Sequence, residues 1–401
     1  MKLLFDFIVL LLIFFKYLYV RLLISFGYMN LNRRKTWLIS EKRTEARDNG
    51  YYMFRFLRNS DIKDNVYYSI VKGAQDESKI VPIGNVVEYN SINHIALYLG
   101  SRFLLYCQID SKPYENIHGI GRLDFLCRSK QVRVYLTHGI CKDNVPTSYD
   151  FRLAGYDLFI CGAKPEYDYY KRIYNYPDKN IALTGLCRFD GLENEAVDNL
   201  ILIMPTFRDW LRTNDSTKAK ASESECKLMQ ESDFFKRYSS LLLNKHFLDV
   251  LKRSNCKVYF YLHYTIQPYT HLFQSLDLDK RIIICERGRY DVQDLLKKAK
   301  ILLTDYSSVA FDFAYMKKPI AYYHFDYDLY RHYHYKEGFF NYSENGVGPI
   351  FNNELDLIAW LNKTINNGII LEEPYASRIN DFFLYHDTRN CERVFNSIKK
   401  F

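Results

Sequence analysis

The stretch LLTDYSSVAFDFAYMKKPIAYYHFDYDLY, residues 302–330, contains one complete strand–helix–strand pattern. The apolar run at its start predicts a strand that ends at Thr304, Ser307 is a suitable N-cap for the helix that follows, and 320–324 predicts the next strand. Strands that alternate with helices of this length form parallel sheets covered by helices on both faces. The stretch therefore predicts an α/β fold.

The same alternation continues through most of the chain and predicts two Rossmann-like domains with parallel sheets that face each other across a cleft. Further strands are expected at 66–71, 103–106, 132–137, 158–161, 181–184, 200–204, 258–263 and 282–285. Helices are expected at 240–253, 292–298, 354–367 and 376–399. The resulting division is a hydrophobic segment at 1–30, an N-terminal domain at 31–195, a C-terminal domain at 196–375 and a C-terminal helix at 376–401.

Length and composition are consistent with this division. A chain of 401 residues with 48% apolar and 25% charged residues is globular, which excludes a disordered or fibrous protein. The net charge of +8 is mild for a nucleic-acid binder, so no nucleic acid is expected as a partner, but it suits an anionic substrate or membrane surface. The nine cysteines form no CxxC pair, which indicates reduced thiols and argues against structural zinc.

Residues 3–26 are overwhelmingly apolar and predict a membrane-associating helix. Twenty-four residues would extend about 36 Å, enough to span a bilayer. Lys16 and Arg21 would each be costly inside it, whereas a helix that lies in the interface lets them reach water. A buried core helix is the alternative. The basic flank of Arg33, Arg34 and Lys35 places the downstream chain at the cytoplasmic face of the membrane.

Four polar clusters follow predicted strands, and in parallel α/β sheets ligands bind beyond these carboxyl ends. The first ends in His138-Gly139, where the histidine is a candidate general base and glycine lets a ligand approach the backbone. A packed or solvated histidine is the alternative. The third cluster places His263 at an equivalent position in the second domain.

The second and fourth clusters are suited to phosphate. Arg208, in the string PTFRD, could hold a phosphate by two hydrogen bonds, the alternative being a surface pair with Asp209. In the fourth cluster Thr304 and Asp305 end a strand and Ser307-Ser308 open a helix, whose first N–H groups favour anions. A simple capping sequence is the alternative there.

Other signals are weaker. Gly119-Ile-Gly121 lacks the third glycine of a dinucleotide-binding loop. Asp326-Tyr-Asp328 and His332-Tyr-His334 resemble metal ligands but have no identifiable partner, so no metal is expected.

The stretch 302–330 together with THG (137–139), PTFR (205–208), LH (262–263) and TGLCRFDGL (184–192) resembles the CDP-glycerol glycerophosphotransferase family. This family comprises the teichoic acid primases and polymerases of bacterial cell walls and related capsule enzymes. The resemblance implies a GT-B-like fold, peripheral membrane association, and transfer of glycerol phosphate or a related polyol phosphate. The donor would be CDP-linked, the acceptor a lipid-linked or polymeric hydroxyl, and no cofactor would be needed.

The resemblance also assigns roles to residues. His138 and His263 would be catalytic, and the donor phosphates or nucleotide would contact Arg208, Thr304, Asp305, Ser307 and Ser308. Gly139, Arg188 and Asp190 would support the site. The sequence departs from the family at Thr137 before His138, at Ile140-Cys141 after Gly139, and at Cys187 and Tyr264, which affects the acceptor side more than the donor side.

Two other functions remain open from the sequence. A GT-B glycosyltransferase with a nucleotide-sugar donor would share the fold and the strand-end phosphate site. A non-catalytic membrane-bound protein could keep the cleft to recognise a polymer, although the joint presence of both histidines and the TDYSS string disfavours it.

Overall fold

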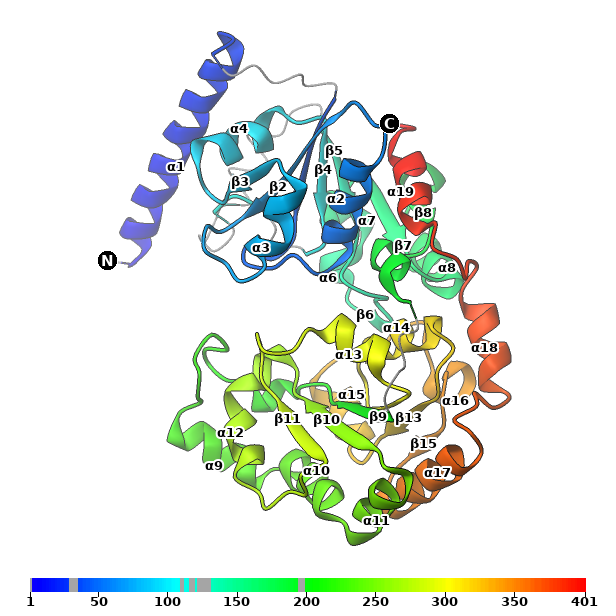
Figure 1. The fold of residues 1–401 in the computed structure, drawn as a ribbon. Helices are drawn as coiled ribbons and strands as arrows, with labels where there is room; N and C mark the ends of the chain where they lie inside the picture. Colours follow the sequence, from blue (N-terminus) through cyan, green and yellow to red (C-terminus); the bar gives the residue numbers. More distant parts are fainter. Residues whose placement is uncertain (1, 29–34, 109–111, 115–119, 121–130, 194–198) are drawn as a thin grey trace. The chain divides into compact units, whose positions relative to one another are not determined.

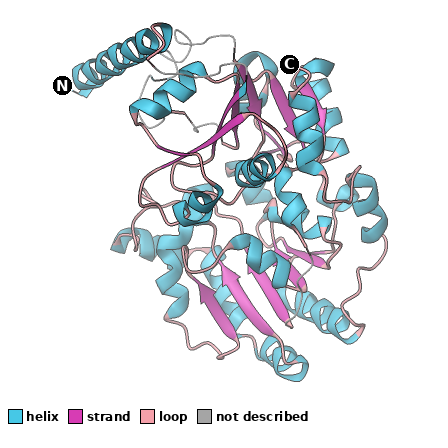
Figure 2. Cartoon of the chain, turned by 45° about the horizontal axis from the view of Figure 1, so that its top comes forward, coloured by secondary structure: helices cyan, strands magenta, loops and turns pink. Residues whose placement is uncertain are grey.

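The computed structural model divides into two compact units, each with its own parallel sheet (Figures 1 and 2). It describes residues 2–28, 35–108, 112–114, 120, 131–193 and 199–401. Unit 1 contains residues 1–140, 146–191 and 387–401, and unit 2 contains 141–145 and 192–386. The predicted α/β class with two parallel sheets is confirmed. The predicted boundary at 195/196, the pair Arg33-Arg34, Gly119 and Gly121 lie outside the described residues.

The described strands of unit 1 form one parallel sheet in the order β3-β2-β1-β4-β5-β7-β8. Their bounds are β1 Thr36–Ser40, β2 Asn65–Ile70, β3 Val86–Glu88, β4 Phe103–Tyr106, β5 Val132–Tyr135, β7 Leu158–Cys161 and β8 Ile181–Leu183. Every residue of β4, β5 and β7 is buried, as in a sheet covered on both faces. β5 is shorter than expected because the backbone of Thr137 turns to a positive φ of 57°.

The N-terminal helix α1 (Lys2–Ser25) lies against α4 (Ile92–Gly100) of unit 1, as the ribbon shows (Figure 1). One stripe of α1 is buried, formed by Ile13, Tyr17, Val20 and Ile24. The ammonium group of Lys16 donates hydrogen bonds to the Tyr114 hydroxyl at 2.6 Å and to the Asn90 carbonyl at 3.4 Å. The charge of Lys16 is therefore satisfied by the protein.

Unit 2 contains a second parallel sheet in the order β11-β10-β9-β12-β13-β15. The strands are β9 Leu200–Met204, β10 Lys257–Tyr261, β11 Ile282–Cys285, β12 Ile301–Thr304, β13 Ile320–Tyr323 and β15 Ile350–Phe351. β9, β12 and β13 are neighbours at the centre and are buried throughout, so their carboxyl ends bring three polar loops together.

The helices of unit 2 differ from the prediction in more than one place. The expected helix at 240–253 is two helices, α10 (Asp233–Leu243) and α11 (Lys245–Ser254). Asn244 separates them because its side chain accepts hydrogen bonds from the backbone of His246 and Phe247 and so starts α11. The predictions at 292–298 and 354–367 correspond to α13 (Val292–Lys298) and α17 (Glu354–Asn366).

The expected C-terminal helix at 376–401 is also two helices, α18 (Tyr375–Phe382) in unit 2 and α19 (Asn390–Ile398) in unit 1. The carboxylate of Asp190 accepts hydrogen bonds from the backbone of Asn390 and Cys391, both at 2.8 Å, and from the Asn390 side chain at 2.7 Å. Asp190 thus holds the start of α19, and its site-supporting role stays a prediction.

Candidate active site

In unit 2, the loops after β9, β12 and β13 are tied together by Asp305, whose side chain is fully buried. Its Oδ1 accepts hydrogen bonds from the backbone N–H of Thr206 at 2.7 Å and of Tyr306 at 2.5 Å. Its Oδ2 accepts a bond from the Tyr238 hydroxyl at 3.2 Å. His324 Nε2, after β13, lies 3.0 Å from the Asp305 carbonyl oxygen. Asp305 therefore fixes the three strand ends to one another.

Arg208 completes this arrangement from the loop after β9. Its guanidinium is fully buried and pairs with Asp305 Oδ2 at 3.0 Å and with both oxygens of Asp326 at 2.7 and 3.0 Å. A further N–H donates to the Thr206 carbonyl at 2.7 Å. Burial alone would lower the pKa of Arg208, but the two carboxylates raise it, so the group stays charged.

Aromatic rings enclose the guanidinium of Arg208. The rings of Tyr306 and Tyr330 stack 3.8 Å apart, and their centres lie 4.9 and 5.4 Å from the guanidinium carbon. Phe234 and Phe325 lie 5.3 and 5.7 Å away. Cations above aromatic faces gain electrostatic energy, most when water is excluded.

These contacts change the interpretation of Arg208. The predicted phosphate contact differs from what the structure shows, because the guanidinium is buried and bound to two carboxylates, so it holds the loop. The alternative surface pair with Asp209 is wrong, since Asp209 pairs with Arg212 at 3.2 Å. Thr304 is also buried and donates its hydroxyl to the Met204 carbonyl at 2.6 Å.

Ser307 and Ser308 are the polar side chains of this motif that reach solvent in part. The helix α14 (Val309–Tyr315) begins directly after them. The predicted N-cap is one residue too early, since Ser308 occupies the cap position without a side-chain cap bond. The Ser307 hydroxyl oxygen accepts a hydrogen bond from the Val309 N–H at 3.4 Å. Thr304 and Asp305 thus position a turn that presents two serine hydroxyls.

His263 follows β10 and is oriented by its neighbours. Its Nδ1 lies 2.8 Å from the Thr265 hydroxyl, and its ring stacks on Phe207 with a centre-to-centre distance of 4.6 Å. His334 contacts the same Phe207 ring edge-on, also at 4.6 Å. The sequence singled out His334 only as part of an unsupported metal motif, and its contact with Phe207 could not be seen without the fold. Among the described residues, no three His, Cys, Asp or Glu side chains are grouped to hold a metal ion.

In unit 1, His138 lies in a tight turn after β5. The turn places Thr137 at φ 57° and Gly139 at φ 151°, and the Thr137 hydroxyl donates to the Gly139 carbonyl at 2.7 Å. The side chain of Asn49 donates to the carbonyls of Leu136 at 3.1 Å and Thr137 at 2.8 Å. A positive φ costs energy outside glycine and persists only where the surroundings impose it.

Arg188 holds the same turn, whereas its role in supporting a site stays a prediction. It donates to the His138 carbonyl at 2.7 Å and pairs with Asp48 at 2.7 Å. Its backbone N–H donates to the Asn49 side chain at 2.9 Å. Asp48 is the N-cap of α2 (Asn49–Asn59), and neither Asp48 nor Asn49 was predicted from the sequence. The local signal that could have identified them is Asp48 itself, a typical N-cap residue directly before a helical sequence pattern.

The imidazole of His138 is exposed, and its Nδ1 lies 3.2 Å from the Tyr135 hydroxyl. The protein around the ring still displaces enough water to lower the pKa of His138 below 6.5; Asp48 opposes this shift, and Arg188 adds to it. The neutral form, which can accept a proton, therefore predominates at neutral pH.

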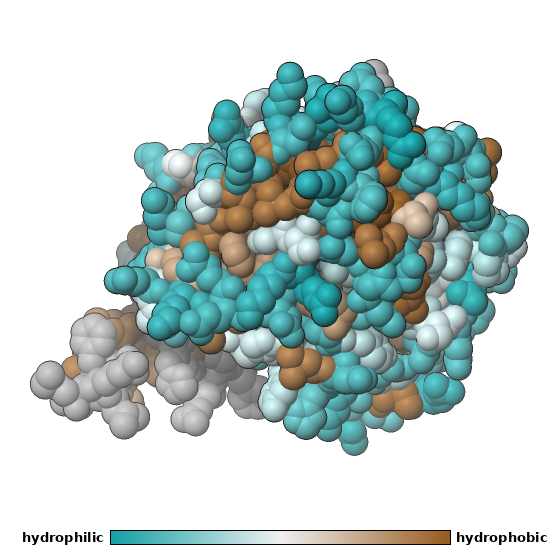
Figure 3. Space-filling view, turned by 90° about the horizontal axis from the view of Figure 1, so that it is seen from below, coloured by the Kyte–Doolittle hydropathy of each residue, from teal (hydrophilic) through white to brown (hydrophobic). Residues whose placement is uncertain are grey.

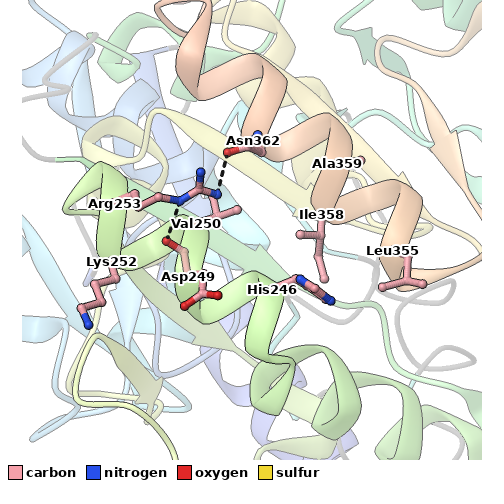
Figure 4. A pocket seen from close by; sticks show the side chains of 9 residues that line it. All are labelled: His246, Asp249, Val250, Lys252, Arg253, Leu355, Ile358, Ala359 and Asn362. Atoms are coloured by element: carbon pink, nitrogen blue, oxygen red, sulfur yellow. Dashed lines mark hydrogen bonds between the residues drawn. The ribbon is translucent and has the colours of Figure 1, made fainter.

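One hollow lies elsewhere in unit 2, between α11 and α17 (Figure 4). It has a volume of about 720 Å³, and Arg253 crosses it to donate to Asn362 at 3.3 Å. None of the predicted site residues lines it. Seen from below, apolar side chains form patches within a mainly hydrophilic surface (Figure 3).

Comparison with known proteins identifies the family. The family model described as CDP-Glycerol:Poly(glycerophosphate) glycerophosphotransferase matches residues 22–400. The chain belongs to this family. Both the His138 turn and the Asp305–Ser308 loop lie within the matched region.

Similar curated proteins take part in teichoic acid synthesis. The minor teichoic acid biosynthesis protein GgaB of Bacillus subtilis (strain 168) is 30% identical over 374 residues, which cover 92% of this chain and 40% of GgaB. The teichoic acid glycerol-phosphate primase of the same organism is 41% identical over 70 residues, 18% of this chain and 17% of the primase. The chain spans less than half the length of these relatives.

Solved structures confirm the GT-B-like α/β class. The wall teichoic acid polymerase TagF superimposes with a TM-score of 0.65 at 18% identity, covering 91% of this chain and 89% of that one. The UDP-GlcNAc 2-epimerase of Neisseria meningitidis gives a TM-score of 0.53 at 10% identity, covering 91% and 100%. At such identities the likeness concerns the fold alone.

The buried Arg208 cluster predicts a large loss of stability when its cation is removed. Arg208→Gln leaves two carboxylates buried without a counter-charge, which should cost about 3–5 kcal/mol of unfolding free energy. Arg212→Gln breaks an exposed pair with Asp209 and a contact with the Phe207 ring, and it should cost about 0–1 kcal/mol. Urea unfolding followed by circular dichroism measures both, and equal costs would contradict the proposed role of Arg208.

Proposed function

We propose that the chain transfers glycerol phosphate, or a related polyol phosphate, from a CDP-linked donor to a hydroxyl of a lipid-linked or polymeric acceptor, with release of CMP. Membership of the family is the observation that carries this proposal. The relatives named for teichoic acid synthesis support it, as does a TagF structure soaked with CDPG. The polymer is then a teichoic acid or a similar polymer of the cell surface.

In the proposed reaction the acceptor oxygen bonds to the glycerol-side phosphorus of the donor. The bond from that phosphorus to the bridging oxygen breaks, and CMP leaves with its electron pair. The acceptor proton passes to the neutral imidazole of His138, whose lowered pKa suits it to accept a proton at neutral pH.

Unit 2 would hold the donor diphosphate. The hydroxyls of Ser307 and Ser308 are presented by a turn that Asp305 and Arg208 fix, so these donors need little reorganisation when charge develops. His263, held by Thr265 and Phe207, would supply a further polar contact. Positioning and electrostatics provide most of the catalysis in phosphoryl transfer.

The transfer assay gives the most direct prediction. With labelled CDP-glycerol and a lipid-linked acceptor, the full chain should release CMP and label the acceptor. His138→Asn should lower kcat by about 10²–10⁴-fold because the base is lost. In the wild type, kcat/KM should decrease on the acid side of the pH profile because protonation of His138 removes the base. Since the pKa of His138 is lowered from 6.5, this decrease should occur below pH 6.5.

The exposed His246→Asn on α11 is the matched control and should keep the wild-type rate. CDP-ribitol in parallel identifies the polyol. Turnover of a nucleotide sugar without CMP release from any CDP-polyol would contradict the proposed donor class.

We also propose that α1 attaches the chain to the cytoplasmic face of the membrane by lying in the interface. Within the described residues, Phe7–Ser25 is long and apolar enough to cross a membrane. One stripe of α1 packs on the rest of unit 1. Other apolar side chains of the same helix are exposed, among them Phe7 (62%), Leu12 (64%) and Phe15 (55%). A helix packed along one side on protein and apolar on the other suits the surface of a bilayer.

This attachment predicts that charge on the exposed stripe weakens vesicle binding. Leu12→Glu with Phe15→Glu should reduce co-sedimentation with phosphatidylglycerol vesicles by about tenfold or more, because two exposed apolar side chains that would enter the bilayer are replaced by carboxylates. Leu355→Glu, at a 57% exposed site on α17, should have no effect. Equal binding of all three proteins would argue against α1 as the attachment.

A further inference from the structure

The segment Cys141–Val145 belongs to unit 2, although it begins only two residues after Gly139 of unit 1. Its strand β6 (Asp143–Asn144) pairs antiparallel with β14 (Lys336–Glu337). A Cβ on Gly338 would lie 2.4 Å from the Lys142 carbonyl oxygen, so the two backbones approach as closely as glycine allows. The chain after His138 is thus fixed to the donor-side unit.

The carboxylate of Asp143 in this segment is shared by two cations, Lys142 and Arg331. Lys142 Nζ lies 2.5 Å from Asp143 Oδ2, and Arg331 Nη1 lies 2.7 Å from Asp143 Oδ1. The side chains of Lys142 and Arg331 are only 4% and 13% exposed. The two cations and the one carboxylate carry a net positive charge that is largely removed from water, and this burial lowers the pKa of Lys142 although Asp143 and Asp305 oppose the shift. A further anion beside the trio would offset the cost of burying this charge.

Several buried polar atoms of this trio and of the neighbouring His334 make no hydrogen bond with the described residues. They are Nε and Nη2 of Arg331 and both ring nitrogens of His334. Burial lowers the pKa of His334 to about 4, so its ring is neutral and offers one donor and one acceptor. Buried polar groups are rarely left unpaired, and such atoms often mark the place of a ligand.

The unpaired atoms have the geometry for an anion. Nη1 of Arg331 already donates to Asp143, so Nε and Nη2 form the remaining edge of the guanidinium. Such an edge can donate to two phosphate oxygens at once. The Tyr342 ring lies 5.7 Å from Lys142 Nζ and 5.9 Å from the Arg331 guanidinium, which supports both cations. His334 shares the Phe207 ring with His263, so this group adjoins the strand-end loops.

We propose that Lys142, Arg331 and His334 form a subsite for a phosphate group of a substrate. The proposal rests on the proposed function, which supplies two such groups: the diphosphate of a CDP-linked donor and a phosphodiester of a growing acceptor. Arg331 binds two phosphate oxygens, His334 adds a neutral hydrogen bond, and Lys142 contributes charge.

Arg331→Gln and His334→Gln test the subsite in the full chain. Binding of CDP-glycerol is measured by calorimetry, and KM is measured for a synthetic glycerol-phosphate oligomer. Arg331→Gln should raise one of these constants about tenfold or more, and His334→Gln should raise the same constant about threefold. A change confined to CDP-glycerol assigns the donor diphosphate, and a change confined to the oligomer assigns the acceptor phosphate.

Arg253→Gln on α11 makes the same chemical change at an exposed site and should alter neither constant. If Arg331→Gln fails to fold, Arg331→Lys keeps a cation beside Asp143 but loses the two-oxygen edge, and it should show the same defect. Constants within twofold of wild type for both substitutions would overturn the subsite.

Inorganic pyrophosphate separates this test from that of the proposed function. If the wild type transfers nothing from CDP-glycerol, the proposed function fails. The subsite is still supported if the wild type binds pyrophosphate and Arg331→Gln weakens that binding about tenfold. It is contradicted if the wild type and Arg331→Gln bind pyrophosphate equally.

Discussion

The buried ion pair of Arg208 with Asp305 and Asp326 is the interaction on which the donor-side loops depend. It joins the ends of β9, β12 and β13, with a separation of 118 residues between Arg208 and Asp326. Three charges without water are costly unless each is paired and hydrogen-bonded, and here backbone N–H groups, two tyrosine hydroxyls and stacked rings provide those partners. The cluster therefore fixes one arrangement of the loop that carries Ser307 and Ser308.

Unit 1 follows the same principle with different residues. Asp48 and Asn49 at the start of α2 bind Arg188 and the backbone of the His138 turn, so a helix terminus holds a strained turn after a strand. In both units the residues that would meet substrate are few and partly exposed, while buried polar groups behind them set their positions. Arg208 and Asp305 would thus shape the proposed donor site without facing a ligand.

The sequence predicted the sheets well because buried parallel strands are continuous apolar runs. In the two parallel sheets, β1, β3 and β15 were missed. TWLIS of β1 has only three apolar residues and is recognisable mainly by its pairing with β2 and β4, and β3 and β15 are only three and two residues long. The partners of Arg208, the transfer of Cys141–Val145 to unit 2 and the return of α19 to unit 1 all depend on contacts between distant residues. No local sequence pattern predicts contacts of this kind. His138 was found because its signal, a histidine before glycine at a strand end, is local.

In the proposed reaction the Ser307–Ser308 turn holds the donor diphosphate, and the buried Arg208 supports this turn. A crystal structure of the full chain with CDP-glycerol tests this most directly. Diphosphate oxygens should lie about 2.7–3.2 Å from the Ser307 or Ser308 hydroxyl, with Arg208 still paired to Asp305 and Asp326. A diphosphate bound directly by Arg208 with those pairs broken, or bound away from this turn, would contradict it.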